Sequence, residues 1–139
     1  MRPIFARVRP GTHSVCIADR LRELGLSVHT MKSETAAKLN SEHAKICAEG
    51  YYNPSYVAIR LFVWYVTDSG QFDAAELASP GALSRSIMTM RRWTALDPIQ
   101  AAAIEIEITA LKLFLLNVFD NVKVPHDAKL AAQDRLVSA

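Results

Sequence analysis

The sequence predicts a mainly α-helical protein, a compact bundle of five or six helices in one globular domain over residues 1–139. Apolar residues recur every three or four positions from residue 33 onward, as they do on the buried face of a helix. Half of the 139 residues are apolar, which is enough to fill one core and excludes a disordered chain. Three predicted helices begin with a capping side chain followed by proline: Asn53-Pro54, Ser79-Pro80 and Asp97-Pro98.

The first 31 residues fit a short strand–helix–strand element, while residues 33–139 are expected to be helical. Apolar and basic residues alternate over residues 4–9, which is typical of a strand with one polar face. Helical spacing follows over residues 14–24, where Gly25 and Leu26 have the order expected of a Schellman-type helix end. A second strand is expected over residues 27–31.

The remaining elements follow from apolar spacing and from the residues at helix ends. We expect a helix from Ser33 to Glu49 that buries His43 as a core histidine. Residues 54–67 predict a helix because of the Asn53-Pro54 start, although the valines and aromatic residues over 56–66 also fit a strand. Further helices are expected over residues 73–78, 82–92 and 98–121, and after Pro125.

The predicted helix over residues 98–121 is apolar almost all round, which is typical of a central helix or an oligomer interface. We therefore expect a homodimer. Glu105 and Glu107 lie about 200° apart on this helix and cannot form an acid–base pair on one face. Glu107 has apolar helical neighbours, so it should pair with a cation or have a raised pKa. The predicted cation is Arg60, in a buried structural ion pair with Glu107.

Four residues near the predicted start of the first helix form a candidate anion-binding site. They are Arg7, Arg9, Thr12 and His13. Free N–H groups at a helix start attract a phosphate or carboxylate. The alternative is a solvated turn in which Thr12 or Ser14 caps the helix.

The sequence indicates neither catalysis nor metal binding. The four histidines have no spacing of three or four residues that would place two of them on one helical face. Cys16 and Cys47 lie inside predicted helices, where thiols are usually inert, and no glycine-flanked serine elbow is present. We expect no enzyme, no cofactor and no metal. An enzyme with an anionic substrate near His13 or Glu107 is the least favoured hypothesis.

A candidate partner-binding surface lies in the helix over residues 82–92 and just beyond it. Its residues are Arg85, Met88, Arg91, Arg92 and Trp93. Methionine adapts to varied surfaces, and tryptophan and arginine anchor many protein interfaces. Burial of the methionine and tryptophan in the core is the alternative.

The same segment also resembles the helix-turn-helix of bacterial regulators, in which a Ser-Pro-Gly turn often opens the recognition helix. The resemblance covers residues 73–92 and implies that Ser84, Arg85, Thr89 and Arg92 face DNA. It implies in addition that Leu83, Ile87 and Met90 face inward. The chain departs from the family in its short first helix and in the cap–proline helix that follows Trp93.

The net charge of +2 is too small to indicate nucleic-acid binding by itself. The longest apolar segments contain charges, Arg60 in one and Glu105, Glu107 and Lys112 in the other, so neither predicts a membrane span. We therefore expect a small cytoplasmic protein-binding regulator, an adaptor or inhibitor, whose partner is another protein. The alternative is a DNA-binding transcriptional regulator that uses residues 73–92.

Overall fold

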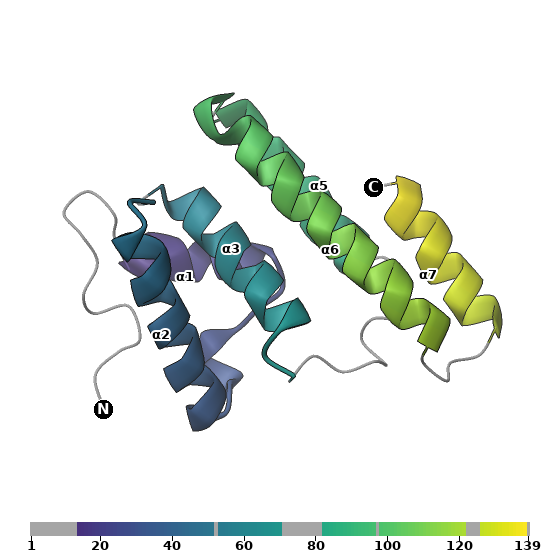
Figure 1. Ribbon diagram of the computed structural model, residues 1–139, viewed down its shortest axis with the longest axis horizontal. Coiled ribbons are helices and arrows are strands. Elements are labelled where there is room, and N and C mark those ends of the chain that lie inside the picture. The colour runs from purple at the N-terminus through teal and green to yellow at the C-terminus, as the bar shows by residue number, and fades with distance from the viewer. Residues whose placement is uncertain (1–13, 52, 71–81, 97, 122–125, 139) are drawn as a thin grey trace.

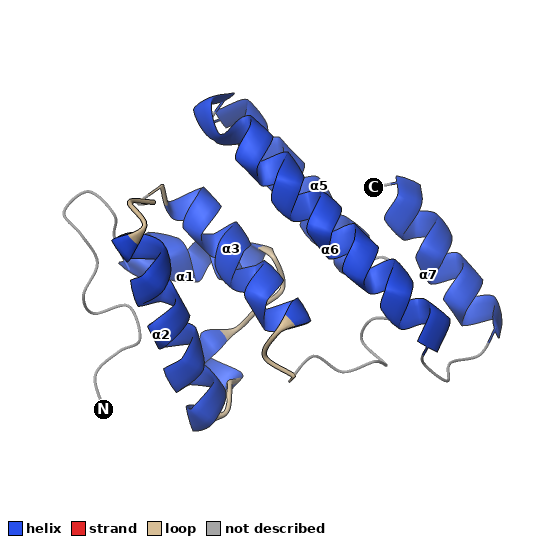
Figure 2. Cartoon of the chain, in the orientation of Figure 1, coloured by secondary structure: helices blue, strands red, loops and turns tan. Residues whose placement is uncertain are grey.

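The computed structural model describes residues 14–51, 53–70, 82–96, 98–121 and 126–138. These residues form six α-helices and two 3-10 helices, and no strand occurs among them (Figure 2). The α-helices are α1 (Ser14–Glu23), α2 (Ser33–Ala48), α3 (Pro54–Thr67), α5 (Ala82–Leu96), α6 (Ala101–Asn121) and α7 (His126–Ser138). The 3-10 helices are η1 (Val28–Thr30) and η2 (Pro98–Gln100). The predicted mainly helical class is confirmed, and the single-domain assignment stays a prediction.

Two helices, α3 and α6, occupy the centre of the bundle (Figure 1). They pack against each other, as the apolar character of both predicts. Helices α1 and α2 pack on α3, whereas α5 and α7 pack on α6. Because only η2 and Asp97 separate α5 from α6, these two run antiparallel as a long hairpin (Figure 1).

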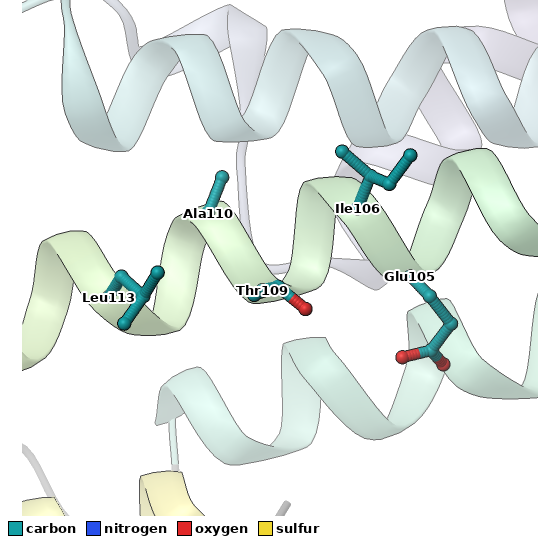
Figure 3. Close-up of a pocket in the computed structure, with 5 residues that line it drawn as sticks. All are labelled: Glu105, Ile106, Thr109, Ala110 and Leu113. Atoms are coloured by element: carbon teal, nitrogen blue, oxygen red, sulfur yellow. The ribbon is translucent and has the colours of Figure 1, made fainter.

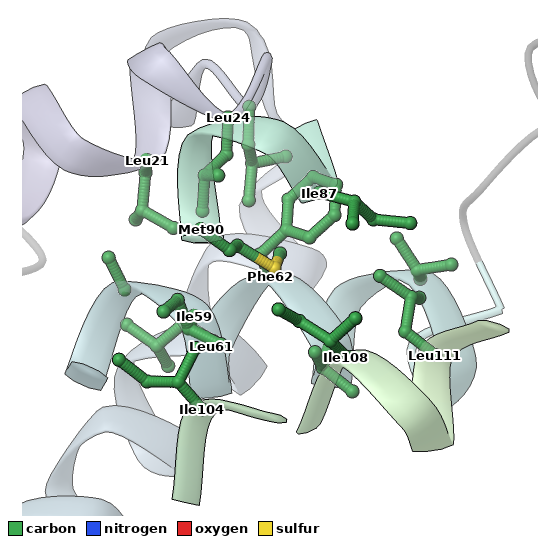
Figure 4. Close-up of a cluster of buried hydrophobic side chains, with 14 of the residues drawn as sticks. Leu21, Leu24, Ile59, Leu61, Phe62, Ile87, Met90, Ile104, Ile108 and Leu111 are labelled. Carbon is green, nitrogen blue, oxygen red and sulfur yellow. The ribbon is translucent and has the colours of Figure 1, made fainter. Parts of the chain in front are cut away.

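The core is continuous across these helices. In α3, nine of the fourteen residues are buried, since neighbours cover it on several sides. Figure 4 shows aliphatic side chains of four helices around Phe62 and Met90, among them Leu21 of α1 and Ile108 of α6. Each fully buried aliphatic or aromatic side chain contributes about 1.5–3 kcal/mol through removal of apolar surface from water.

Residues at the ends of α3 and α1 confirm two local predictions. The Asn53 side chain caps α3, because its Oδ1 accepts a hydrogen bond from the Tyr56 backbone N–H at 3.0 Å. The helix bounds match the predicted range 54–67, so the strand alternative for 56–66 is wrong. After α1, Gly25 has φ +91°, and the Leu26 N–H donates to the Leu21 carbonyl at 2.9 Å. Leu26 is buried, which completes the predicted Schellman-type end.

The predicted strand over residues 27–31 is wrong, because this segment contains the 3-10 helix η1. Its hydrogen bonds are local: the Thr30 hydroxyl donates to the Ser27 carbonyl, and the Met31 N–H donates to the Val28 carbonyl. Val28 and Met31, three residues apart, both pack on the core, which is the period of a 3-10 helix rather than of a strand. The predicted strand over residues 4–9 lies outside the described residues.

Helix α2 begins at Ser33 and buries His43. The sequence also predicts Ser33 as the cap of this helix, but Lys32 occupies the N-cap position without a side-chain hydrogen bond and Ser33 is the first helical residue. His43 is buried with 3% of its surface exposed, as predicted for a core histidine, and burial lowers its pKa.

In the described part of the chain, every helix is too short or too polar to cross a bilayer.

Candidate interaction surface

Helix α6 has two apolar faces on opposite sides of its axis. We call Ile104, Ile108, Leu111 and Leu115 its inner face, and each of these side chains is 0% exposed. On the other side, Ile106 is 68% exposed and Leu113 is 64% exposed. At 100° per residue, the two sets are centred roughly 180° apart. Helix α6 therefore has apolar residues on two opposite sides, and the described neighbouring helices cover only one of them.

The exposed side of α6 is a continuous strip. We define the outer face of α6 as Ala102, Ile106, Thr109, Ala110 and Leu113, all of which are exposed. Four of these residues, together with Glu105, line an open hollow in the surface (Figure 3). Just before α6, Ile99 of η2 is 92% exposed and lies one 3-10 turn before Ala102. Exposed apolar strips of this kind mark interaction sites on helical proteins.

Two carboxylates lie on the opposite flanks of α6 and connect it to different helices. On one flank, Glu105 Oε2 is 3.6 Å from Arg91 Nη2 of α5. On the other, Glu107 Oε1 is 3.5 Å from Arg60 Nε of α3. The two glutamates are therefore separated as their helical spacing predicts. Between these flanks, the inner face of α6 packs on the core and its outer face points to solvent.

The Arg60–Glu107 pair that the sequence predicts is present. It is half-buried rather than buried, since both side chains are about a fifth exposed. Arg60 Nη1 also donates to Glu49 Oε2 at 3.1 Å. The rings of Tyr51 and Tyr56 lie 5.7 and 5.8 Å from the guanidinium carbon, a distance that allows cation–π contact. The sequence did not point to Glu49 or Tyr51, because neither is near Arg60 along the chain.

Burial raises the pKa of Glu107, and this effect exceeds the opposing attraction of Arg60. The negative charge of Glu49 raises it further. The enzyme hypothesis also expects a raised pKa at Glu107. Here burial and the negative charge of Glu49 account for the shift, while Arg60, which also contacts Glu49 at the C-cap of α2, opposes it. Among the described residues, no three histidine, cysteine or acidic side chains are grouped so that they could hold a metal ion.

The structure divides the predicted partner-binding surface on α5. Arg85, Met88, Arg91 and Arg92 are exposed, and Met88 has 59% of its surface accessible. Trp93 is only 3% exposed and lies in the core, with the Arg20 guanidinium 5.1 Å from its ring centre. Its assignment to the surface is therefore corrected. Trp93 comes three residues after Met90 and continues the buried stripe of α5, which explains its position.

The helix-turn-helix resemblance is corrected at one residue within α5. Leu83, Ile87 and Met90 face inward as the resemblance implies, and Arg85 and Arg92 are exposed. Thr89 is 6% exposed, so it does not face DNA. Its hydroxyl donates to the Arg85 carbonyl at 2.9 Å and accepts a hydrogen bond from Arg92. The first helix of the resemblance and its turn, residues 73–81, lie outside the described residues.

The candidate anion site also lies outside the described residues, since Arg7, Arg9, Thr12 and His13 all precede α1. The residues of the outer face were not predicted as a site. The sequence signal for them is the apolar character of the whole predicted helix, which indicated a central helix or an oligomer interface. Only the packing of α3, α5 and α7 on α6 shows which side the described helices leave uncovered.

Comparison of the chain with models of protein families, with curated protein sequences and with solved structures found no match.

Proposed function

We propose that the protein is a noncatalytic protein-binding regulator that binds an apolar helix of its partner on the outer face of α6. The observation that carries the proposal is the exposure of Ile106 and Leu113, each about two-thirds accessible, on a helix whose other side lies in the core. Because each side chain is about two-thirds exposed, covering it fully would contribute about 1–2 kcal/mol. Such a gain favours burial of this face against another molecule.

The geometry of the outer face fits a helical partner. Ile106, Ala110 and Leu113 follow the i, i+4, i+7 spacing by which helices pack along one another. Thr109 and Ala110 are small, so a second helix can approach closely between the two larger side chains.

Charged groups border this apolar strip on its α5 side. The Arg91–Glu105 ion pair lies there, and both side chains are about half exposed. Met88 comes three residues before Arg91 on α5 and is exposed on the neighbouring turn. A polar rim around an apolar centre is typical of protein–protein interfaces. Met88 and Arg91 of the predicted patch thus remain in the proposed surface, and Ile106 and Leu113 take the place of Trp93 as its anchors.

The proposal is tested by photo-cross-linking in cells that express the protein. Ile106 is replaced by the photoreactive residue p-benzoylphenylalanine, and a matched protein carries the same residue in place of Val137, an apolar residue of α7 that is 66% exposed. We expect a defined protein adduct from position 106, lost when Leu113→Asp is added, and none of that mass from position 137.

Equal adducts from positions 106 and 137, or adducts that survive Leu113→Asp, would contradict the proposal. Salt-sensitive binding of duplex DNA that is lost in Arg85→Ala, without any adduct at position 106, would instead support the helix-turn-helix alternative.

A further inference from the structure

We propose that the helix bound to the outer face of α6 is α6 of a second copy of this chain, antiparallel to the first and related to it by a two-fold axis at Ile106. The inference rests on the proposed function, because it names the partner of the same surface. It adds a symmetry, a register and a set of residue pairs that can each be tested.

The order of large and small residues along the strip is symmetric about Ile106. Ala102 and Ala110 lie four residues before and after it, and Ile99 and Leu113 lie seven residues before and after it. All five positions are exposed. The strip therefore has the order large, small, large, small, large in both directions along the chain. A surface that is the same in both directions is what a two-fold interface requires.

The antiparallel arrangement gives every large residue a partner of similar size. A two-fold axis at Ile106 places the two Ile106 side chains together, and Ala102 of one copy against Ala110 of the other. Ile99 then lies against Leu113 of the second copy. An axis between Thr109 and Ala110 would pair Ile106 with Leu113 but would leave Ile99 without an apolar partner. The register centred on Ile106 covers more of the exposed apolar residues.

The charged side chains of Glu105 and Arg91, beside the apolar strip, are compatible with the same two-fold axis. Glu105 is next to Ile106 in the chain, so the axis brings the two Glu105 side chains near each other on one flank. Each is accompanied by Arg91, 3.6 Å from Glu105 within its own copy. Two acidic and two basic groups then alternate across the interface and balance. Arg91 therefore has a specific role, since without it the two carboxylates would repel each other.

The expected dimer is weak. The strip from Ile99 to Leu113 covers fifteen residues, whose fourteen steps of 1.5 Å span roughly 21 Å, and it holds a single helix pair. Such a contact lies at the lower end of specific interface sizes, for which we expect a dissociation constant on the order of 10–100 µM. The dimer therefore forms at high protein concentration and dissociates on dilution.

Cysteine cross-linking tests the register. Ile106→Cys should form a disulfide-linked dimer by itself, because the axis places the two thiols within bonding distance. Leu113→Cys alone should not, since its two copies lie roughly 21 Å apart along the helix. A mixture of Ile99→Cys and Leu113→Cys should give the mixed dimer. Val137→Cys is the exposed control on α7, and the unsubstituted chain, which keeps Cys16 and Cys47, gives the background.

Sedimentation velocity measures the same association without cross-linking. Relative to the unsubstituted protein, we expect the dissociation constant of the dimer to rise at least tenfold in Ile106→Asp and several-fold in Arg91→Met. It should stay unchanged in Val137→Asp. Circular dichroism checks that each variant is folded.

Three results would overturn the inference. One is a monomer at all concentrations up to about 1 mM, well above the expected dissociation constant. Another is a yield of disulfide-linked dimer from Ile106→Cys that is no greater than the yield from Val137→Cys. The last is a yield of disulfide-linked dimer from Leu113→Cys alone that equals the yield from Ile106→Cys. If photo-cross-linking at position 106 still captured a different protein, the proposed function would stand and only its self-association would be wrong. If neither experiment gave an adduct, both would be wrong.

Discussion

The inner and outer faces of α6 are made of the same kinds of residue, yet one lies at the centre of the core and the other in solvent. Leu111 and Leu113 are two residues apart, and their exposed fractions are 0% and 64%. Hydrophobicity alone does not separate them, because the difference comes from the described helices, which pack on one side of α6 only. A helix with apolar residues on both sides can thus bury one side in the core and leave the other in solvent.

The largest expected difference between the two faces is in stability. Leu111→Ala should lower the free energy of unfolding by about 2–5 kcal/mol, since it removes buried methyl groups and leaves a cavity. Leu113→Ala, measured at a concentration where the protein is monomeric, should change it by less than about 0.5 kcal/mol. Chemical denaturation followed by circular dichroism measures both. A cost for Leu113→Ala similar to that for Leu111→Ala would show that the outer face is packed within the monomer.

The two flanks of α6 should differ by a smaller amount. Arg60→Met removes the partner of the half-buried Glu107 and should cost about 1–2 kcal/mol of unfolding free energy. Arg91→Met removes the partner of Glu105 from a more exposed pair and should cost less than about 0.5 kcal/mol. Thermal and chemical unfolding of the two variants give the comparison. Equal losses of unfolding free energy would mean that the Arg60–Glu107 pair stabilises the packing of α3 on α6 no more than the Arg91–Glu105 pair stabilises that of α5 on α6.

The change of unfolding free energy with pH that Glu107 causes should be smaller still. Its pKa is raised in the fold above the ordinary value of 4.5, so the folded state binds the proton more tightly than the unfolded state. The stability that protonation provides is therefore present at low pH and is lost as pH rises through the window between these two pKa values. Glu107→Gln, which imitates the protonated form, should equal the unsubstituted protein in acid and be slightly more stable at pH 7.

Carboxyl-carbon NMR of labelled glutamate follows Glu107 directly. Its pKa should lie above 4.5, and Arg60→Met should raise it further, because the positive charge of Arg60 favours the carboxylate. A pKa that Arg60→Met leaves unchanged would argue against direct contact between the two side chains in solution.

Much of the helical architecture could be predicted from the sequence, because helix ends have local causes. Asn53 and Pro54 are sufficient to start α3, and Gly25 followed by Leu26 is sufficient to end α1. The Arg60–Glu107 pair could also be predicted, because each helix is apolar around a single charge and the two charges need each other.

Features that depend on tertiary packing could not be predicted in the same way. Over residues 27–31, five residues are too few to distinguish a period of two from a period of three, and the segment contains a 3-10 helix. Trp93 was expected on the surface by residue type and Thr89 by the helix-turn-helix resemblance, but both lie on the buried side of α5. The outer face of α6 was not predicted as a site because its residues look like core residues until the positions of the neighbouring helices are known.

Methyl NMR tests most directly the proposal that the outer face of α6 associates with a second copy of the chain while the inner face lies in the core. Ile104, Ile106 and Ile108 lie on one helix and are 0%, 68% and 0% exposed. In protein labelled at the isoleucine methyl groups, a concentration series should shift the Ile106 resonance and leave those of Ile104 and Ile108 in place. Three resonances that all stay fixed, or an Ile106 resonance that moves no more than the other two, would contradict the claim.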